Sequence, residues 1–236
     1  MKRTVIITGG TKGLGREMSL AFGSQGYYVM ALYASDDAAA QQLRVALDAA
    51  KADGCVLRYD VSVEDARIWN RPEIQDADSL TLIHNACAPF SPVPMHQLRW
   101  RDFEVNFNVA VKAGWLCSQA LIRLMLKKGG GTIVNILTSA IEGSPPKGFG
   151  AYVTAKHALR GLTLALAAEY AARGVRVFSV SPGFMETPLT GQWDDRMREA
   201  IRAAATRITI PSEAAARIVE LVESAAAAGQ GENYPI

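Results

Sequence analysis

A tyrosine and a lysine lie four residues apart, Tyr152 and Lys156, inside the apolar stretch GAYVTAKHA at residues 150–158. On a helix, residues i and i+4 share one face. Many such pairs are solvated surface groups. If this pair instead lines a cleft, the ammonium group favours the ionised phenol and lowers its pKa from about 10 by roughly 1–3 units. The spacing then indicates a proton donor that works near neutral pH.

A glycine-rich turn, TGGTKGLG at residues 8–15, follows a short apolar run at 4–8 and opens a helical pattern. Glycine permits tight turns, and the backbone N–H groups of a helix N-terminus bind phosphate. The spacing of Gly9, Gly13 and Gly15 differs from the G-x-G-x-x-G pattern of dinucleotide-binding proteins. The turn therefore indicates a pyrophosphate site, with a plain tight turn as the alternative.

These residues need a scaffold, and apolar runs alternate with helical patterns along the whole chain. Strands are expected at 4–8, 27–33, 55–59, 79–84, 132–137 and 175–180, and helices at 15–26, 36–54, 62–69, 100–127, 151–173, 194–206 and 212–227. The tail GENYPI adds a weak last strand. This alternation predicts an α/β protein with a doubly wound parallel sheet and helices on both faces. Without a linker or repeat, we expect one domain over 1–236.

The composition excludes several classes of protein. The 236 residues have a net charge of +2 and no Lys/Arg run, which argues against nucleic acid as a partner. Three widely spaced cysteines, Cys55, Cys87 and Cys117, fit neither a disulfide framework nor a zinc site, so we expect no metal and a reducing, cytoplasmic compartment. No signal peptide or run of 18 apolar residues is visible, so no membrane span is expected.

Together the motifs resemble the short-chain dehydrogenases/reductases over nearly the whole chain. Four signatures occur in the family's order: the T-G-x-x-x-G-x-G loop from Thr8 to Gly15, Asn85-Ala86 after the fourth strand, Ser139 thirteen residues before Tyr152, and Pro182-Gly183 with Thr187 beyond. Within the family, the pattern is similar to bacterial 3-oxoacyl-carrier-protein reductases and related carbonyl reductases. The resemblance implies a single-domain Rossmann-like fold.

The resemblance also implies a ketoreductase with Ser139, Tyr152 and Lys156 as catalytic residues. In the family, the tyrosine gives its proton to the substrate carbonyl oxygen as hydride arrives. The lysine bonds to the nicotinamide ribose and lowers the tyrosine pKa, and the serine orients the carbonyl. The expected reaction is NADP(H)-dependent reduction of a ketone or 3-oxoacyl-type carbonyl to an alcohol, or the reverse.

The expected cofactor is NADP, with NAD possible. Lys12 matches a basic residue of relatives that prefer NADP, and Tyr33 and Ser35 leave room for a 2′-phosphate. Asp36, 21 residues beyond Gly15, is an alternative ribose ligand, but we expect it to cap the next helix. The expected cofactor contacts are Gly9, Thr11, Lys12, Gly13, Leu14, Gly15, Tyr33, Ser35, Asp60, Val61, Asn85, Ala86, Tyr152, Lys156, Pro182, Gly183 and Thr187.

Two positions depart from the family pattern. Where the family has a catalytic asparagine in the long helix, Ala110 is in register, with Asn106 one turn back and Asn108 out of register. A bent helix would rescue one of these asparagines. Cys87, in HNAC, replaces a glycine that packs near the cofactor. These departures leave open a lyase, dehydratase or epimerase on the same fold.

A third class of function is a cofactor-binding regulator, against which the intact Ser139, Tyr152 and Lys156 argue. The expected partner is a small-molecule or carrier-bound carbonyl substrate. The resemblance implies a homotetramer or homodimer that pairs helices 100–127 and 151–173 between subunits. The histidines His84, His96 and His157 share no metal-ligand spacing and are expected at strand ends or on the surface. 

Overall fold

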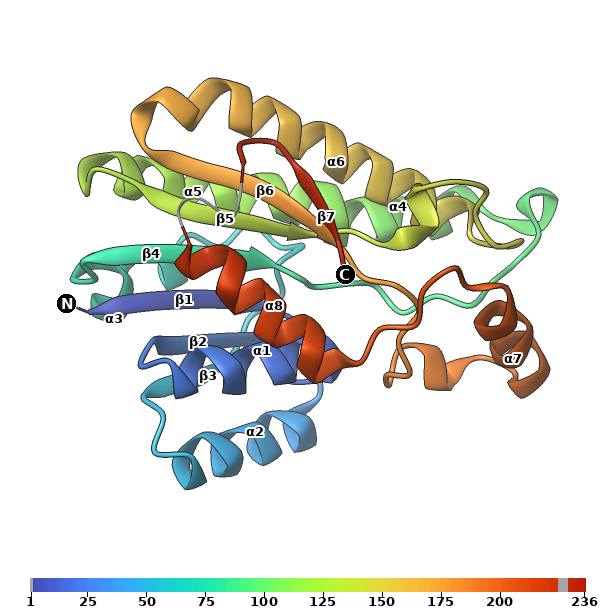
Figure 1. The fold of residues 1–236 in the computed structure, drawn as a ribbon, viewed down its shortest axis with the longest axis horizontal. Coiled ribbons are helices and arrows are strands. Elements are labelled where there is room, and N and C mark those ends of the chain that lie inside the picture. The colour runs from blue at the N-terminus through green and yellow to red at the C-terminus, as the bar shows by residue number, and fades with distance from the viewer. Residues whose placement is uncertain (1, 225–228) are drawn as a thin grey trace.

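The structure, a computed structural model, describes residues 2–224 and 229–236. Within these residues, seven parallel strands form one sheet in the order β3-β2-β1-β4-β5-β6-β7 (Figure 1). The strands are β1 (Arg3–Thr8), β2 (Tyr28–Tyr33), β3 (Gly54–Arg58), β4 (Ser79–His84), β5 (Gly131–Ile136), β6 (Val175–Ser181) and β7 (Asn233–Pro235). The predicted doubly wound, Rossmann-like sheet is confirmed, including the weak last strand.

The central strands are apolar on both faces because helices cover both sides of the sheet. Val5, Ile6 and Ile7 of β1, for example, are all completely buried. Their side chains alternate between the two cores: Val5 and Ile7 face one, and Ile6 faces the other. This continuous apolar run is the signal from which the strand was predicted.

Three helices pack on each face of the sheet (Figure 1). One face carries α1 (Gly13–Ser24), α2 (Asp37–Ala49) and α8 (Pro211–Glu223). The other face carries α3 (Pro72–Gln75), α5 (Ala113–Lys127) and α6 (Gly150–Tyr170). Two further helices, α4 (Trp100–Phe107) and α7 (Asp195–Ala204), lie toward the carboxyl-terminal edge of the sheet.

Several predicted helices differ from the structure. The helix predicted at 36–54 ends earlier, at Ala49, and Gly54 begins β3. A helix at 62–69 is wrong: a 3-10 turn at Arg67–Asn70 is followed by α3, which begins at Pro72. Proline at the first helical position has a favourable fixed φ and needs no N–H partner, so Pro72 starts a helix instead of stopping one. The last helix ends at Glu223, and residues 225–227 of its predicted span lie outside the described residues.

The predicted helix 100–127 is divided by a π-helical segment, Asn108–Lys112, between α4 and α5. By length and apolar composition, Trp100–Lys127 would also pass as a membrane span. This is weak support for a membrane role, because Cys117 and Leu121 of α5 are buried against the sheet. The same test is passed by core helices of soluble proteins.

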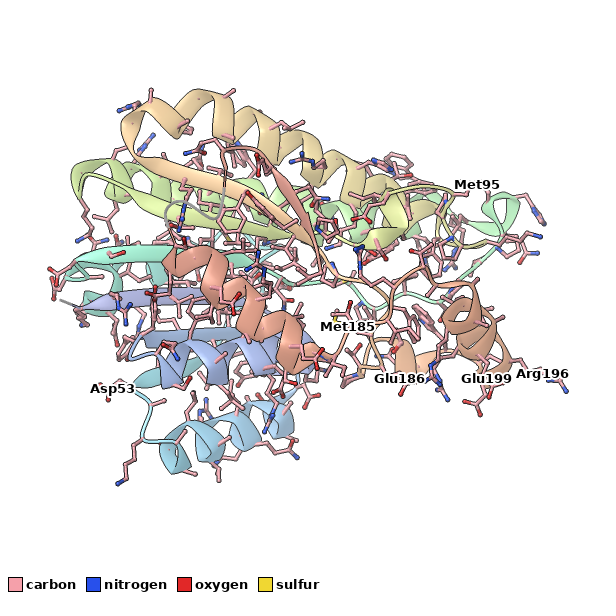
Figure 2. All side chains as sticks on the ribbon, in the orientation of Figure 1. Asp53, Met95, Met185, Glu186, Arg196 and Glu199 are labelled. Carbon is pink, nitrogen blue, oxygen red and sulfur yellow. The ribbon has the colours of Figure 1, made fainter. Side chains whose placement is uncertain are left out.

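The carboxyl ends of β1, β4, β5 and β6 meet along one edge of the sheet. The chain crosses from one half of the sheet to the other between β3 and β4, so β1 and β4 lie side by side at the switch point. Ligands of doubly wound sheets bind in the crevice beyond this edge. Helix α7 lies out beyond it, with Met185 and Glu186 nearby, while Asp53 lies at the opposite end of the molecule (Figure 2).

Candidate active site

The glycine-rich turn between β1 and α1 forms a backbone cradle at this edge. Gly9 and Gly13 adopt left-handed φ angles of +62° and +51°, which residues with side chains rarely adopt. A Cβ on Gly15 would collide with the Gly9 carbonyl oxygen. The turn leads into the N-terminus of α1, where free N–H groups and the helix dipole favour phosphate. The residues present therefore fit a dinucleotide pyrophosphate.

Asn85 and Thr8 fasten this turn to the end of β4. The Asn85 side-chain amide donates to the carbonyl oxygens of Thr8 and Gly9, at 3.0 and 3.1 Å. The Thr8 hydroxyl accepts from the backbone N–H groups of Asn85 and Ala86, at 2.9 and 3.0 Å. These bonds join the ends of two neighbouring strands, so protein groups alone fix the shape of the cradle.

The segment after β6 reaches the same cradle. A Cβ on Gly13 would lie 3.3 Å from the Thr187 side chain. Pro182, Gly183 and Thr187 also line the cavity that contains Ser139. The structure thus brings together predicted cofactor contacts from the first and the last third of the chain.

Further predicted contacts follow β2 and β3 along the same edge. Tyr33 ends β2, and its hydroxyl donates to the Asp37 carboxylate at 2.8 Å, while Ser35 is exposed just beyond. Asp60 follows β3 and accepts hydrogen bonds from the backbone and hydroxyl of Ser62, at 2.9 and 2.7 Å. Asp60 therefore caps the turn that follows β3. Val61, beside it, is buried.

Thr11 and Leu14 are two further predicted contacts, and both are buried. They are 3% and 5% exposed, and Leu14 belongs to the core beneath α1. These two residues are therefore expected to contribute backbone groups to the cradle.

Lys12 and Asp36 form an ion pair at 2.9 Å where the ends of β1 and β2 meet. Asp36 also caps α2 by accepting from the Ala39 N–H at 3.0 Å, as the sequence predicts. These bonds lower the pKa of Asp36, the one from the Ala39 backbone most and the one from Lys12 next. The lysine predicted to bind a 2′-phosphate is therefore already paired with a carboxylate.

Ser139, Tyr152 and Lys156 converge beyond the ends of β5 and β6. Lys156 Nζ lies 5.8 Å from the centre of the Tyr152 ring. The ammonium group is buried and donates to the Ile136 carbonyl at 2.6 Å. Ser139 starts a 3-10 turn after β5, and its N–H donates to the Pro182 carbonyl at 2.8 Å. Ser139 and Tyr152 line the same cavity.

Burial dominates the pKa of Tyr152. Desolvation raises this pKa far above its ordinary value, the Cys87 thiol raises it further, and the Thr138 side chain lowers it. Burial likewise lowers the pKa of Lys156. The net shift of the tyrosine pKa is therefore upward, opposite to the expected lowering, and the charge of Lys156 is not among its causes. The ammonium group bonds to the Ile136 carbonyl, and loss of water around the phenol is the larger effect.

The π-helical segment places Ala110 next to His84 at the end of β4. The His84 ring is buried, and its Nε2 lies 2.9 Å from the Ala110 carbonyl oxygen. Since a carbonyl only accepts, Nε2 carries the proton, and Nδ1 faces the Thr8 hydroxyl at 3.3 Å. Burial, and then the charge of Lys156, lowers the pKa of His84 to about 4. His84 is therefore a neutral strand-end residue, as expected.

The π-helical segment does not place an asparagine where the family has one. Asn106 is buried, and its amide donates to the Asp102 carbonyl at 2.8 Å, one turn back in its own helix. Asn108 lies in the first position of the π-helical segment. Ala110 has no polar side chain, and its carbonyl already accepts from His84. The His84–Ala110 bond therefore lies where the family pattern expects the asparagine.

The remaining reactive side chains give no second centre. Cys87 is partly exposed, its Sγ donates to the Ala88 carbonyl at 3.4 Å, and burial raises the pKa of its thiol. His96 and His157 are exposed. Across residues 2–224 and 229–236, no group of three or more His, Cys, Asp or Glu side chains is placed to hold a metal ion.

Aromatic rings wall the cavity beside Tyr152, which has a volume of about 230 Å³. Phe90 stacks on Tyr152 and meets Phe149 and Trp193 edge to face, at centroid distances of 5.2 and 5.4 Å. The Trp193 indole N–H donates to the Phe90 carbonyl at 2.8 Å. The sequence patterns singled out none of Phe90, Trp193 and Thr138. The aromatic character of the first two, in loop-like segments, was the available signal.

The phosphate cradle and the buried tyrosine–lysine pair meet at one edge of a parallel sheet, which is how nicotinamide-dependent dehydrogenases are organised. Residues 3–198 match the family model described as short chain dehydrogenase. This chain belongs to that family and is an NAD(P)-dependent oxidoreductase.

Several known proteins are similar to it. Acetoacetyl-CoA reductase of Allochromatium vinosum is 29% identical, over 100% of this chain and 97% of that protein. The crystal structure of acetoin dehydrogenase from Enterobacter cloacae is 28% identical with a TM-score of 0.83, over 100% and 94% of the two chains. A structure of a putative NAD(P)-dependent gluconate 5-dehydrogenase from Beutenbergia cavernae, with bound NADP, is 26% identical with a TM-score of 0.86, over 99% and 94%.

Proposed function

We propose that this protein reduces a ketone-type carbonyl to an alcohol, or catalyses the reverse, with NADP(H) as the preferred cofactor. The proposal rests chiefly on the Ser139, Tyr152 and Lys156 arrangement, which faces an apolar cavity next to the phosphate cradle. The similarity to acetoacetyl-CoA reductase and acetoin dehydrogenase supports a carbonyl or its alcohol as substrate. When bound, the nicotinamide would supply or accept the hydride.

Each of the three side chains has a separate proposed role. Tyr152 holds the proton that the substrate oxygen receives, and its raised pKa keeps that proton in place at neutral pH. Ser139 orients the carbonyl from the wall of the same cavity. Lys156, anchored on the Ile136 carbonyl, holds the ribose end of the cofactor and stabilises negative charge on the phenol oxygen as the proton leaves.

NADP is favoured by the lysine in the phosphate turn. A 2′-phosphate has more negative charge than Asp36, with which Lys12 pairs, and an exposed ion pair of this kind is worth only about 0–1 kcal/mol. A phosphate would therefore compete well for Lys12. The NADP-bound neighbour supports this cofactor. Asp36 opposes it by charge repulsion, so we expect a moderate preference with NADH still used.

The proposed assembly and location are those that the family resemblance implies. We propose a homodimer or homotetramer built through α4, α5 and α6, acting in the cytoplasm on a small-molecule or carrier-bound substrate. Trp115 and Leu164, on α5 and α6, are 46% and 49% exposed although both are large and apolar, which supports burial by a second subunit. The whole of 1–236 is proposed to act as one domain.

The direct test is absorbance of the reduced nicotinamide during incubation with a panel of ketones. We expect consumption of NADPH, faster than of NADH, and none with Tyr152→Phe. Binding of both cofactors with turnover but no net change in absorbance would instead support a lyase or epimerase. Binding with no turnover of any kind would support a regulator. Calorimetric titration of each cofactor separates these outcomes from a protein that binds neither.

A further inference from the structure

We propose that the substrate is a neutral carbonyl compound with an aromatic ring next to the carbonyl. This inference rests on the proposed carbonyl reduction and adds the chemical class. Two observations support it: the arrangement of rings around Tyr152, and the absence of a free cation in the cavity wall, as far as the described residues show.

The charge of the cavity argues against an anionic substrate. Among the described residues, Glu142 is the only charged residue in the cavity wall. Its carboxylate is paired with Arg207 at 2.9 Å. A carboxylate or phosphate on the substrate would therefore lose water and meet no unpaired cation in return, which is costly.

Two polar side chains of residues 185–206 that line the cavity are already hydrogen-bonded within the protein. The Thr190 hydroxyl donates to the carbonyls of Met185 and Thr187, at 3.0 and 3.1 Å, and accepts from the Thr187 N–H at 3.0 Å. The indole N–H of Trp193 is bonded to Phe90. These two side chains are therefore not free to bind hydroxyl groups of a substrate.

The aromatic side chains favour a ring. Phe149 lies edge to face with Tyr152 and with Trp193, at centroid distances of 5.9 and 5.5 Å. Phe90 stacks on one face of Tyr152. A ring next to the carbonyl that receives the tyrosine proton would enter this cluster, where edge-to-face contacts stabilise it beyond simple apolar burial.

Phe90 also sets the size of that ring system. Phe90 lines this cavity and also a second cavity, which extends toward α4. Tyr152 is the other residue of the aromatic cluster that lines both cavities. The Phe90 ring therefore forms a partition between them. Ser139 lines only the first cavity, so the substrate portion that contacts both Ser139 and Tyr152 lies there. Its volume of about 230 Å³ is enough for one ring, since a cavity of about 150 Å³ admits benzene.

The first test is a matched pair of substrates. Methyl 4-acetylbenzoate and 4-acetylbenzoate have the same ring and ketone and differ in charge. We expect kcat/KM to be at least about tenfold higher for the neutral ester. Acetophenone should exceed cyclohexyl methyl ketone by about 2- to 12-fold, the range of an aromatic contact. Equal values within either pair would overturn the proposed class.

The second test substitutes Trp193 in the wall of the cavity. Trp193→Leu should bring the acetophenone to cyclohexyl methyl ketone ratio close to one, whereas Trp193→Phe, which keeps a ring but loses the bond to Phe90, should retain it. Trp100→Leu is the control, because Trp100 is 77% exposed on α4 and outside both cavities. Partial unfolding would lower the rates with both ketones alike and leave their ratio unchanged. A change in the ratio therefore reports a change in substrate recognition. An unchanged ratio in Trp193→Leu contradicts the inference.

The outcomes separate this inference from the proposed function. Reduction of an acetoacetyl thioester without reduction of any aryl ketone would leave carbonyl reduction standing and refute the aromatic class. Cofactor binding without reduction of any carbonyl compound would refute both.

Discussion

The rings of Phe90 and Tyr152 lie face to face, with centroids 4.5 Å apart and planes inclined by 12°. Phe90 thereby excludes water from one face of the phenol, and loss of water disfavours its ionised form. A protonated phenol is the form that donates to a carbonyl, whereas alcohol oxidation needs the ionised form. The stacking therefore favours the reductive direction at neutral pH.

This relationship predicts opposite pH profiles for the two directions. Because the pKa of Tyr152 is raised, reductive kcat/KM should stay nearly flat from about pH 6 to 9, while oxidation should rise through that range. Phe90→Leu admits water and should move the oxidative rise to lower pH. Initial rates across the range check this, with Trp100→Leu as the matched surface control. A rise that stays in place would show that Phe90 has no influence on the phenol.

Tyr152→Phe and Lys156→Ala should fail in different ways. The phenylalanine variant loses the proton donor, so turnover should drop by about 10²–10⁴-fold while cofactor affinity stays nearly unchanged. The alanine variant should lose both, because Lys156 is expected to hold the ribose as well. Single-turnover rates and calorimetric titration measure the two properties. If Tyr152→Phe keeps more than about a tenth of the rate, another group donates the proton.

The Lys12–Asp36 pair predicts cofactor choice. Lys12→Ala should weaken NADPH by about 10- to 150-fold, the value of a charge-assisted hydrogen bond, and change NADH only slightly. Asp36→Asn keeps a good helix cap but removes the charge that opposes a 2′-phosphate, so NADPH should bind more tightly. Dissociation constants of both variants for NADPH and NADH test these expectations. A loss of NADH binding in Asp36→Asn would identify Asp36 as the ribose ligand instead.

Burial of neutral His84 predicts a loss of stability in mild acid. Its pKa falls from 6.5 to about 4 on folding, so between these values the unfolded chain binds a proton that the folded protein does not. The free energy of unfolding should therefore fall by up to about 3 kcal/mol as pH drops from about 6.5 to about 4. Urea unfolding across this window measures it. His84→Asn should flatten the dependence and exposed His157→Asn should not.

The apolar residues exposed on α5 and α6 predict assembly. The chain has a mass of 25.4 kDa, and light scattering at micromolar concentration should give two or four times this value. Leu164→Glu should reduce the mass, because it buries a charge in the proposed interface, whereas Val45→Glu on α2, at a similarly exposed residue, should not. A monomeric mass for the unaltered protein would contradict the prediction.

Much of the fold was predictable because its signals are local. The apolar run of β1 and the cap at Asp36 depend on neighbouring residues, and both appear as expected. The π-helical segment was missed because one extra residue per turn leaves the apolar pattern on both sides intact. Pro72 was misread because the same residue starts helices and stops them.

The site was less completely predictable because burial is a property of the whole fold. The spacing of Tyr152 and Lys156 gave their position on one helix face. The sign of the shift in the tyrosine pKa depends on burial, to which distant residues contribute; Phe90, stacked on the ring, is 62 residues away in the sequence. Trp193 likewise meets Phe90 only through tertiary structure.

The segment that covers the cavity is closed at its base. Phe184 N–H donates to the Arg207 carbonyl at 2.9 Å, and Thr209 N–H donates back to the Phe184 carbonyl at 2.8 Å. Residues 185–206 therefore leave and rejoin the sheet region at one point, while the phosphate cradle is held separately by Asn85. Because its two ends lie next to each other, this segment could be exchanged as a unit. Grafting it from a relative, with Thr187 beside Gly13 retained, would transplant substrate preference and leave the cofactor half of the enzyme in place.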